Sequence, residues 1–226
     1  MRDSVRLENA LESAGEDAMI TLHHCADARS FRALWALEEA GVDYDLKVLP
    51  FPPRVRAREF LDINPFGTIP LLVDGESRMT ESAAICQYLA ERYAPALSVS
   101  STDPAYGAYL NALHMGEATL TFPQTLVLRY SQMEPQERRL PQAAADYSKW
   151  TLARLRAYDK VRGDAEFAAA GRFTAADISV AYAVMLTKVI GLWPDVPERL
   201  RAYFERSAAR PAFQRAKAAQ GGASIF

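Results

Sequence analysis

Thr80-Glu81-Ser82 places a carboxylate and a hydroxyl at the start of an expected amphipathic helix, which ends near Tyr93. A helix N-terminus carries free backbone N–H groups and a partial positive charge, and both attract a carboxylate. Ser82 can add a hydroxyl donor for such a ligand, and Glu81 can accept a hydrogen bond from an ammonium group. The pattern predicts a receptor for the α-amino-acid end of a small molecule. The alternative is ordinary capping by Thr80 or Ser82.

A second stretch with possible chemistry precedes it, in "NPFGTIPLLVDG". Residues 64–67 are an expected turn, and Pro70 begins an apolar strand. Proline cannot donate to a strand ladder, so it belongs at a strand's start or edge, and it leaves the backbone of Ile69 unpaired. If the Ile69–Pro70 bond is cis, that backbone can pair with a small peptide as an added strand would. The alternative is an edge proline that only prevents aggregation.

The stretches that must position these residues alternate between strand-like and helix-like spacing of their apolar side chains. Strand-like stretches begin near Ile20, at Tyr44 and at Thr68, and the last of them reads as a hairpin turned at Asp74-Gly75. Helix-like stretches lie over 30–41, 58–65 and 79–93. The order is β-α-β-α-β-β-α. The first crossover predicts parallel strands and the hairpin predicts an antiparallel pair, so we expect a mixed four-stranded sheet.

The second half of the chain has a different character. Residues 95–104, "PALSVSSTDP", are rich in small and polar side chains and predict a linker. Beyond it we find no convincing strand alternation, which predicts an all-α domain. Thr174 and Asp177 form an expected capping box that serves folding rather than chemistry. The expected helices are Ala105–Leu120, Gln124–Tyr130, Gln142–Val161, Ala175–Leu192 and Glu198–Ala208.

Composition narrows the class of protein. The 226 residues are 50% hydrophobic, with 26 basic against 28 acidic side chains, and this near balance gives no reason to expect nucleic acid or a membrane surface as a partner. Two cysteines are too few for a disulfide framework and indicate a reducing compartment. Residues 1–18 lack the apolar centre of a signal peptide and predict a loose polar extension. We therefore expect a cytoplasmic protein.

The combined string of "NPFG", "IP", "LLVDG", "ES" and "AI", within this element order, resembles the cytosolic glutathione S-transferase superfamily. The likeness covers residues 20 to about 208. The segments "RSFR", "ALWALEEAGVDY" and "YLNALHMGEATL" look most like its bacterial and fungal subgroup. The resemblance implies a thioredoxin-like N-terminal domain over 19–94 and an all-helical domain over 105–226. It also implies homodimerisation, glutathione as the bound thiol and a role in detoxification.

The resemblance also assigns roles in binding glutathione. Ile69, before Pro70, would pair with the cysteinyl backbone, and Glu81 and Ser82 would hold the γ-glutamyl ammonium and carboxylate. The glycine carboxylate needs a cation. Arg54 lies at a suitable position along the chain, before Ile69, and Arg56 and Arg58 are the alternatives. Thr68 stands where many relatives have Lys or Gln, so one charged contact is missing from this sequence.

Catalysis needs the thiolate of glutathione, because a thiol of ordinary pKa, about 8.5, is mostly protonated at neutral pH. In the family the stabilising group is a Tyr, Ser or Cys near the start of the first helix, but "HHCADARSFR" offers none of these at the aligned positions 27–29. We place Ser30 first and Arg29 second as catalytic candidates. Cys25 remains an alternative through a mixed disulfide. His23 and His24 are more typical of core or edge positions, and Asp27 would repel a thiolate.

The second substrate is expected between the domains. Aromatic and polar side chains share one face of the first C-terminal helix, which suits a hydrophobic electrophile. They are Tyr106, Tyr109, Leu113 and His114, with Glu117 beside them and Phe122 and Tyr130 further on. The alternative is that this stripe belongs to the core. The terminal "GGASIF" could fold over the cleft or fray.

Three functions follow from these patterns. The first is a glutathione transferase that conjugates the thiolate to a hydrophobic electrophile. The second is a glutathione-dependent peroxidase or disulfide reductase, although no C-x-x-C motif is present. The third is a non-catalytic glutathione-binding protein. No metal site is expected.

Overall fold

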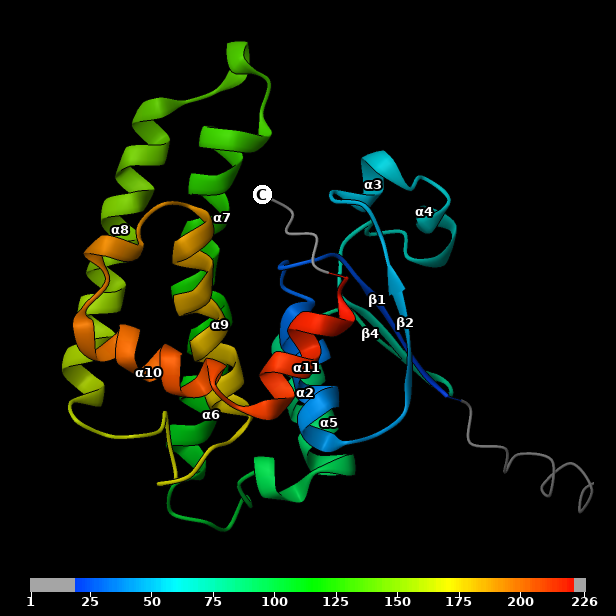
Figure 1. Cartoon of the computed structure of the whole chain (residues 1–226), viewed down its shortest axis with the longest axis vertical. Helices are drawn as coiled ribbons and strands as arrows, with labels where there is room; N and C mark the ends of the chain where they lie inside the picture. The colour runs from blue at the N-terminus through cyan, green and yellow to red at the C-terminus, as the bar shows by residue number, and fades with distance from the viewer. Residues whose placement is uncertain (1–18, 222–226) are drawn as a thin grey trace, which may run out of the picture.

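The computed structural model describes residues 19–221. The predicted extension 1–18 and residues 222–226 of the predicted C-terminal flap lie outside the described residues. The first part of the chain has the expected order of elements, except that one further short helix precedes the expected one between the second and third strands (Figure 1). Its elements are β1 (Ile20–His24), α2 (Phe31–Ala40), β2 (Tyr44–Val48), α3 (Pro53–Arg56), α4 (Phe60–Ile63), β3 (Leu71–Asp74), β4 (Ser77–Met79) and α5 (Ser82–Tyr93).

The four strands form one sheet in the order β2-β1-β3-β4. The crossover through α2 makes β1 and β2 parallel, with Leu22 opposite Leu46. β3 is antiparallel to β1 and to β4, and Leu72 pairs with Leu22 on one side and Met79 on the other. Gly75 adopts a φ of 54° in the hairpin turn, a conformation that glycine reaches without steric cost. The predicted mixed sheet of a thioredoxin-like domain is therefore confirmed.

The second part of the described chain contains helices and no strands, as predicted. Its elements are η2 (Pro95–Leu97), α6 (Tyr106–Met115), η3 (Gly116–Thr121), α7 (Phe122–Leu128), η4 (Arg129–Met133), η5 (Gln136–Arg138), α8 (Pro141–Arg162), α9 (Ala175–Val189), η6 (Trp193–Asp195), α10 (Glu198–Ala208) and α11 (Pro211–Ala219). Within residues 19–221, no helix combines the length and the apolar character needed to cross a bilayer. The exact domain boundaries stay a prediction.

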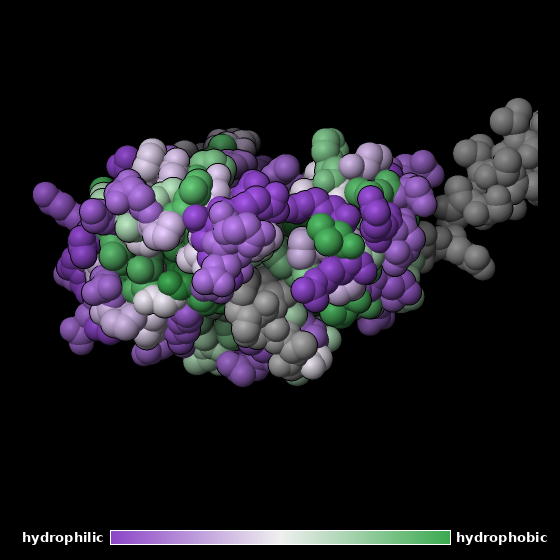
Figure 2. Space-filling view, turned by 90° about the horizontal axis from the view of Figure 1, so that it is seen from above, coloured by the Kyte–Doolittle hydropathy of each residue, from purple (hydrophilic) through white to green (hydrophobic). Residues whose placement is uncertain are grey.

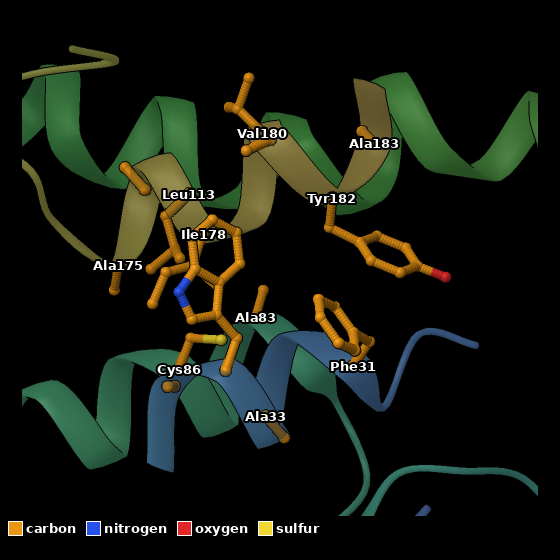
Figure 3. Packing of buried hydrophobic residues seen from close by; sticks show 14 of the residues in the cluster. Phe31, Ala33, Ala83, Cys86, Leu113, Ala175, Ile178, Val180, Tyr182 and Ala183 are labelled. Atoms are coloured by element: carbon orange, nitrogen blue, oxygen red, sulfur yellow. The ribbon is translucent and has the colours of Figure 1, made fainter. Parts of the chain in front are cut away.

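Helix α9 lies at the centre of the core. Every residue from Ala175 to Thr187 is buried, because α2 and α5 pack on one side of the helix and α6 and α10 on others. Figure 3 shows Phe31 of α2 and Cys86 of α5 on the side that faces α9, toward Tyr182 and Ile178. One apolar cluster thus joins both parts of the chain. The expected capping box begins this helix, since Thr174 and Asp177 bond reciprocally.

The run from α6 to η4 departs from the expectation of two separate helices. It is continuous from Tyr106 to Met133, with π-helical turns at η3 and η4. Pro123 is the second residue of α7 and follows directly on the π-helical turn η3, and the run continues through it. π-turns inside α-helices are often found at functional sites.

Helix α11 is absent from the sequence expectations. It begins at Pro211 and packs on α2, where the ring of Phe213 meets Phe31 and Trp35 edge to face. Figure 1 shows α11 beside α2, next to the thioredoxin-like sheet although it is the last helix of the chain. The signal was present, because Pro211 suits the first turn of a helix and the buried Ala212, Phe213 and Ala216 have helical spacing.

Candidate functional site

A cavity of about 690 Å³ lies between the two parts of the chain. One wall comes from the β1–α2 loop and from residues 51–56 and 67–69, and the other comes from α7, η4, η5 and α9. Figure 2 looks at the end of the molecule where α3 and α7 lie, and hydrophilic residues cross the middle of this face. A small molecule bound in this cavity would contact the side chains of both walls.

The β1–α2 loop is hydrogen-bonded to residues in and just after α11, the last helix of the described chain. Asp27, which lines the cavity, has a φ of 54°, a backbone conformation that non-glycine residues adopt rarely. Its carboxylate accepts from Lys217 Nζ at 2.5 Å and from Gln220 Nε2 at 2.8 Å. Its carbonyl accepts from the Tyr182 hydroxyl at 3.0 Å. The negative charge that was expected to repel a thiolate is thus paired with a cation.

Arg32 lies at the centre of a buried polar cluster behind this loop. Its guanidinium is fully buried and lies 4.1 Å above the ring centroid of Tyr182. Its Nη1 group donates to Glu117 at 2.6 Å and to the Ser82 hydroxyl at 3.3 Å. The remaining donors go to the Ser179 carbonyl, the Gly116 carbonyl and the Thr121 hydroxyl. Arg32 therefore links the first helix of the thioredoxin-like domain to α5, η3 and α9.

Glu117 connects this cluster to the cavity. Its second oxygen accepts from Arg29 at 2.7 Å, and Arg29 lines the cavity with 32% of its side chain exposed. Burial alone would raise the pKa of Glu117. The charges of Arg32 and Arg29 and the hydrogen bond from Ser82 outweigh that effect and lower the pKa to about 2. Glu117 is therefore ionised at neutral pH and fixes both arginines.

The first π-turn places Glu117. A Cβ built on Gly116, its first residue, would lie 2.4 Å from the Ser179 hydroxyl and 2.6 Å from a Ser179 backbone atom. Only glycine therefore lets η3 approach α9 this closely. The approach brings the Gly116 carbonyl within 3.0 Å of Arg32.

The two predicted catalytic residues lie in different surroundings. Ser30 is fully buried, with its hydroxyl 2.8 Å from Nδ1 of His24 and bonded to the backbone of Cys25. It does not line the cavity, whereas Arg29 does. His24 is also buried, which lowers its pKa to about 4, and the pKa of the half-buried His23 is lowered mainly by burial too.

The cysteines are both buried and free. Burial raises the pKa of Cys25 to about 12, and the pKa of Cys86 is likewise raised to about 12. Since the thiolate is the reactive form, both side chains are poor nucleophiles at neutral pH. Within residues 19–221, no group of three or more His, Cys, Asp or Glu side chains is arranged to hold a metal ion.

Some of the predicted glutathione contacts line the cavity and others do not. Ile69 lines it, and the Ile69–Pro70 bond is cis. The β1–β3 pairing ends at Leu71, so Ile69 lies outside the ladder. Arg54 lines the cavity, as do its alternative Arg56 and the residue Thr68, but Arg58 does not.

The Glu81-Ser82 pair lies beside the cavity wall. Ser82 is fully buried and donates its hydroxyl to Glu117 at 2.6 Å, so a partner inside the protein already uses it. Glu81 is exposed, and its charge adds to the larger effect of Glu117, which raises the pKa of Arg29 against burial. Glu81 therefore lies within electrostatic reach of the cavity, whereas Ser82 belongs to the Arg32 cluster.

None of the four predicted contacts for the second substrate lines the cavity. Tyr109 and Leu113 are fully buried in the core, Tyr106 packs against it, and His114 is exposed. Helix α6 packs on α9, and Tyr109 and Leu113 of this stripe belong to the core that the helices share. The helical wall of the cavity is instead made by Phe122, Thr125, Leu126, Leu128, Arg129, Met133, Glu134, Pro135, Arg138, Tyr182 and Leu186.

Sequence reasoning noticed Phe122 but not the rest of this wall. The pairing of Arg32 with Glu117 joins residues 85 positions apart, and that of Asp27 with Lys217 joins residues 190 apart. The spacing of residues within one helix or strand cannot show that such distant residues pair. A buried position for Arg32 could have been suspected, since it falls within the apolar run of the first helix.

Comparison with known proteins places these observations in a family. The family model described as glutathione S-transferase, N-terminal domain, matches residues 28–92. Glutathione S-transferase 3 of Schizosaccharomyces pombe is 36% identical over 103 residues, which is 45% of this chain and 43% of that protein. Glutathione S-transferase 3 of Zea mays is 29% identical over 195 residues, which is 83% of this chain and 88% of that protein. The chain thus spans less than half of the first relative and most of the second.

A solved structure extends the likeness to both domains. The sphingomonad glutathione S-transferase complexed with glutathione has a TM-score of 0.77 at 25% identity, and the match covers 90% of this chain and all of that one. Both the thioredoxin-like domain and the helical domain are therefore shared. From its sequence, its fold and these relatives, the chain belongs to the cytosolic glutathione S-transferase superfamily.

Proposed function

We propose that the protein is a glutathione transferase that conjugates the glutathione thiolate to an apolar electrophile. The observation that carries the proposal is the cavity between the domains. One wall has the backbone of Ile69 outside the sheet and the cations Arg29 and Arg54, and the other wall is largely apolar. Relatives named glutathione S-transferases, one of them complexed with glutathione, support the choice of thiol.

In this proposal Arg29 is the group that stabilises the thiolate. It lines the cavity, and its cationic state is secured because Glu117 raises its pKa against the opposing effect of burial. A fixed positive charge lowers the pKa of a nearby thiol. Ser30 is the weaker candidate because its hydroxyl is buried against His24. The sulfur then attacks the electrophilic carbon, the leaving group departs with its electron pair, and the thiol proton goes to solvent.

The test is a titration of bound glutathione by the ultraviolet absorbance of its thiolate, together with turnover of a general aryl halide. We expect a pKa for the bound thiol well below about 8.5, and a larger upward shift in Arg29→Gln than in Ser30→Ala. For glutathione binding, Arg54→Gln should raise the Kd, whereas Arg58→Gln is the control because Arg58 does not line the cavity. An unshifted thiol pKa without turnover would favour a binding protein.

The peroxidase or disulfide reductase is the second candidate function. Its thiol route would need a reactive cysteine, but Cys25 and Cys86 are buried and burial raises the pKa of both. Peroxide turnover that disappears in Cys25→Ser would reverse this ranking. A homodimer, a cytoplasmic location and a role in detoxification complete the proposal, and size-exclusion chromatography with light scattering tests the first of them.

A further inference from the structure

The cavity carries more positive charge than one glutathione needs. Five arginines line it against two carboxylates, those of Asp27 and Glu134. Asp27 is already paired with Lys217, and Arg29 is paired with Glu117, so four of the five arginines remain for other partners. The arginines stand on both walls, so the excess does not belong to the glutathione side alone. Arg29, Arg54 and Arg56 are on the thioredoxin-like side, and Arg129 and Arg138 are on the helical side.

On the helical wall, one carboxylate serves two guanidinium groups. Arg129 Nε lies 2.9 Å from one oxygen of Glu134, and Arg138 Nη2 lies 3.1 Å from the other. The Glu134 side chain is 14% exposed, while those of Arg129 and Arg138 are 57% and 68% exposed. The carboxylate therefore pairs with both arginines at once and leaves one net positive charge. A guanidinium offers more donors than one carboxylate oxygen can take, so both retain N–H groups for a ligand.

Apolar side chains adjoin these arginines on the same wall. Phe122 and Leu126 come from α7, Met133 from η4 and Leu186 from α9. An apolar surface next to guanidinium groups suits a ligand with an apolar body and an anionic group at one end. The planar fork of arginine matches a carboxylate in particular, because both can form two parallel hydrogen bonds.

We propose that the acceptor substrates of this protein are aromatic electrophiles bearing a carboxylate, which Arg129 and Arg138 bind while the ring lies on the apolar wall. This inference rests on the proposed transferase function. For a chloroarene, the thiolate sulfur bonds to the ring carbon and the C–Cl bond breaks. Chloride leaves with the electron pair, and the thiol proton goes to solvent, so no oxidant or reductant is needed.

The test compares 4-chloro-3,5-dinitrobenzoate with its neutral amide, 4-chloro-3,5-dinitrobenzamide, after subtraction of the uncatalysed rates. Hydrogen bonds to charged groups favour binding by roughly tenfold or more, and we expect the low end because these arginines are exposed. The protein should thus prefer the acid by about tenfold in kcat/KM, and Arg138→Gln should reduce that ratio to about 2. Arg156→Gln is the control, since it removes the same charge from an exposed position on α8.

Binding of the unreactive 3,5-dinitrobenzoate and 3,5-dinitrobenzamide, measured by calorimetry with S-methylglutathione present, separates this inference from the proposed function. A preference for the benzoate that Arg138→Gln removes and Arg156→Gln keeps supports the carboxylate site, even if neither chloroarene is turned over. Absence of turnover with that binding preference would contradict the proposed transferase function but support the carboxylate site. Equal binding and equal kcat/KM for acid and amide, or the same ratio in both variants, overturns the inference while turnover leaves the transferase intact.

Discussion

Replacing Arg32 by methionine should strongly destabilise the protein. Methionine keeps much of the side chain's length but donates no hydrogen bond. The Glu117 carboxylate would then keep Arg29 and the Ser82 hydroxyl as partners but lose its 2.6 Å contact with the buried cation. The carbonyls of Gly116 and Ser179 would also lose the donors that Arg32 supplies in the core.

Two routes give the magnitude of the loss. Removing one partner of a buried ion pair costs about 3–5 kcal/mol, because the other charge stays buried. Independently, the pKa of Glu117 falls from its ordinary 4.5 to about 2, which corresponds to about 3 kcal/mol of net favourable interaction at about 1.4 kcal/mol per pKa unit. In the variant, Arg29 and Ser82 would still supply part of this favourable interaction with Glu117. We expect a loss of about 3 kcal/mol in the free energy of unfolding, or a Tm lower by about 6–12 °C.

The assay is urea unfolding at pH 7, followed by tryptophan fluorescence and analysed by linear extrapolation. Arg156→Met, at an exposed position on α8, is the matched control and should change stability by less than about 0.5 kcal/mol. In the Arg32→Met background, Glu117→Gln should recover part of the loss, because it removes a buried negative charge that Arg32 no longer balances. A loss below about 1 kcal/mol, or a double variant less stable than Arg32→Met, would refute the reasoning.

Three further predictions follow from the same contacts. Gly116→Ala should lower Tm, because its Cβ would lie 2.4 Å from a Ser179 atom, and differential scanning calorimetry measures the shift, with Gly107→Ala as the control since a Cβ there meets no atom within 4 Å. Lys217→Gln should raise the pKa of the bound glutathione thiol, because the Asp27 carboxylate at the cavity loses its ion pair. Thiolate absorbance measures that shift, and adding Asp27→Asn should reverse it. Because the folded-state pKa of Glu117 is depressed, its stabilisation is complete above pH 4.5 and is lost as the pH falls toward 2. Urea unfolding between pH 6 and pH 3 should show this loss, and Glu117→Gln should flatten the dependence.

The order of elements was predictable because the information is local. Period-two alternation marks β1 and β2, and Asp74-Gly75 marks the hairpin. The capping box at Thr174 could be read from neighbouring residues. The placing of Ile69 outside the strand ladder followed from the proline beside it.

The side chains of the cavity were less predictable because they depend on how the elements pack. Ser82 was expected to face a ligand, but α5 also contacts η3, where the Ser82 hydroxyl donates to Glu117. The aromatic stripe around Tyr109 was expected at the second substrate, but Tyr109 and Leu113 are fully buried in the core, where α6 packs on α9. Helical periodicity shows which residues share a face, but it does not show which partner that face meets.

The sequence alone determined the thioredoxin-like order of elements, the helical second half and the family resemblance, because hydrophobic period, turn residues and caps act over a few residues. The tertiary structure decided that Arg32 is buried, that α11 neutralises Asp27 and that Arg129 and Arg138 face the cavity. Those outcomes join segments far apart along the chain, and burial sets their energies by removing charges from water. Only the packed molecule specifies which charges are removed and which partners remain.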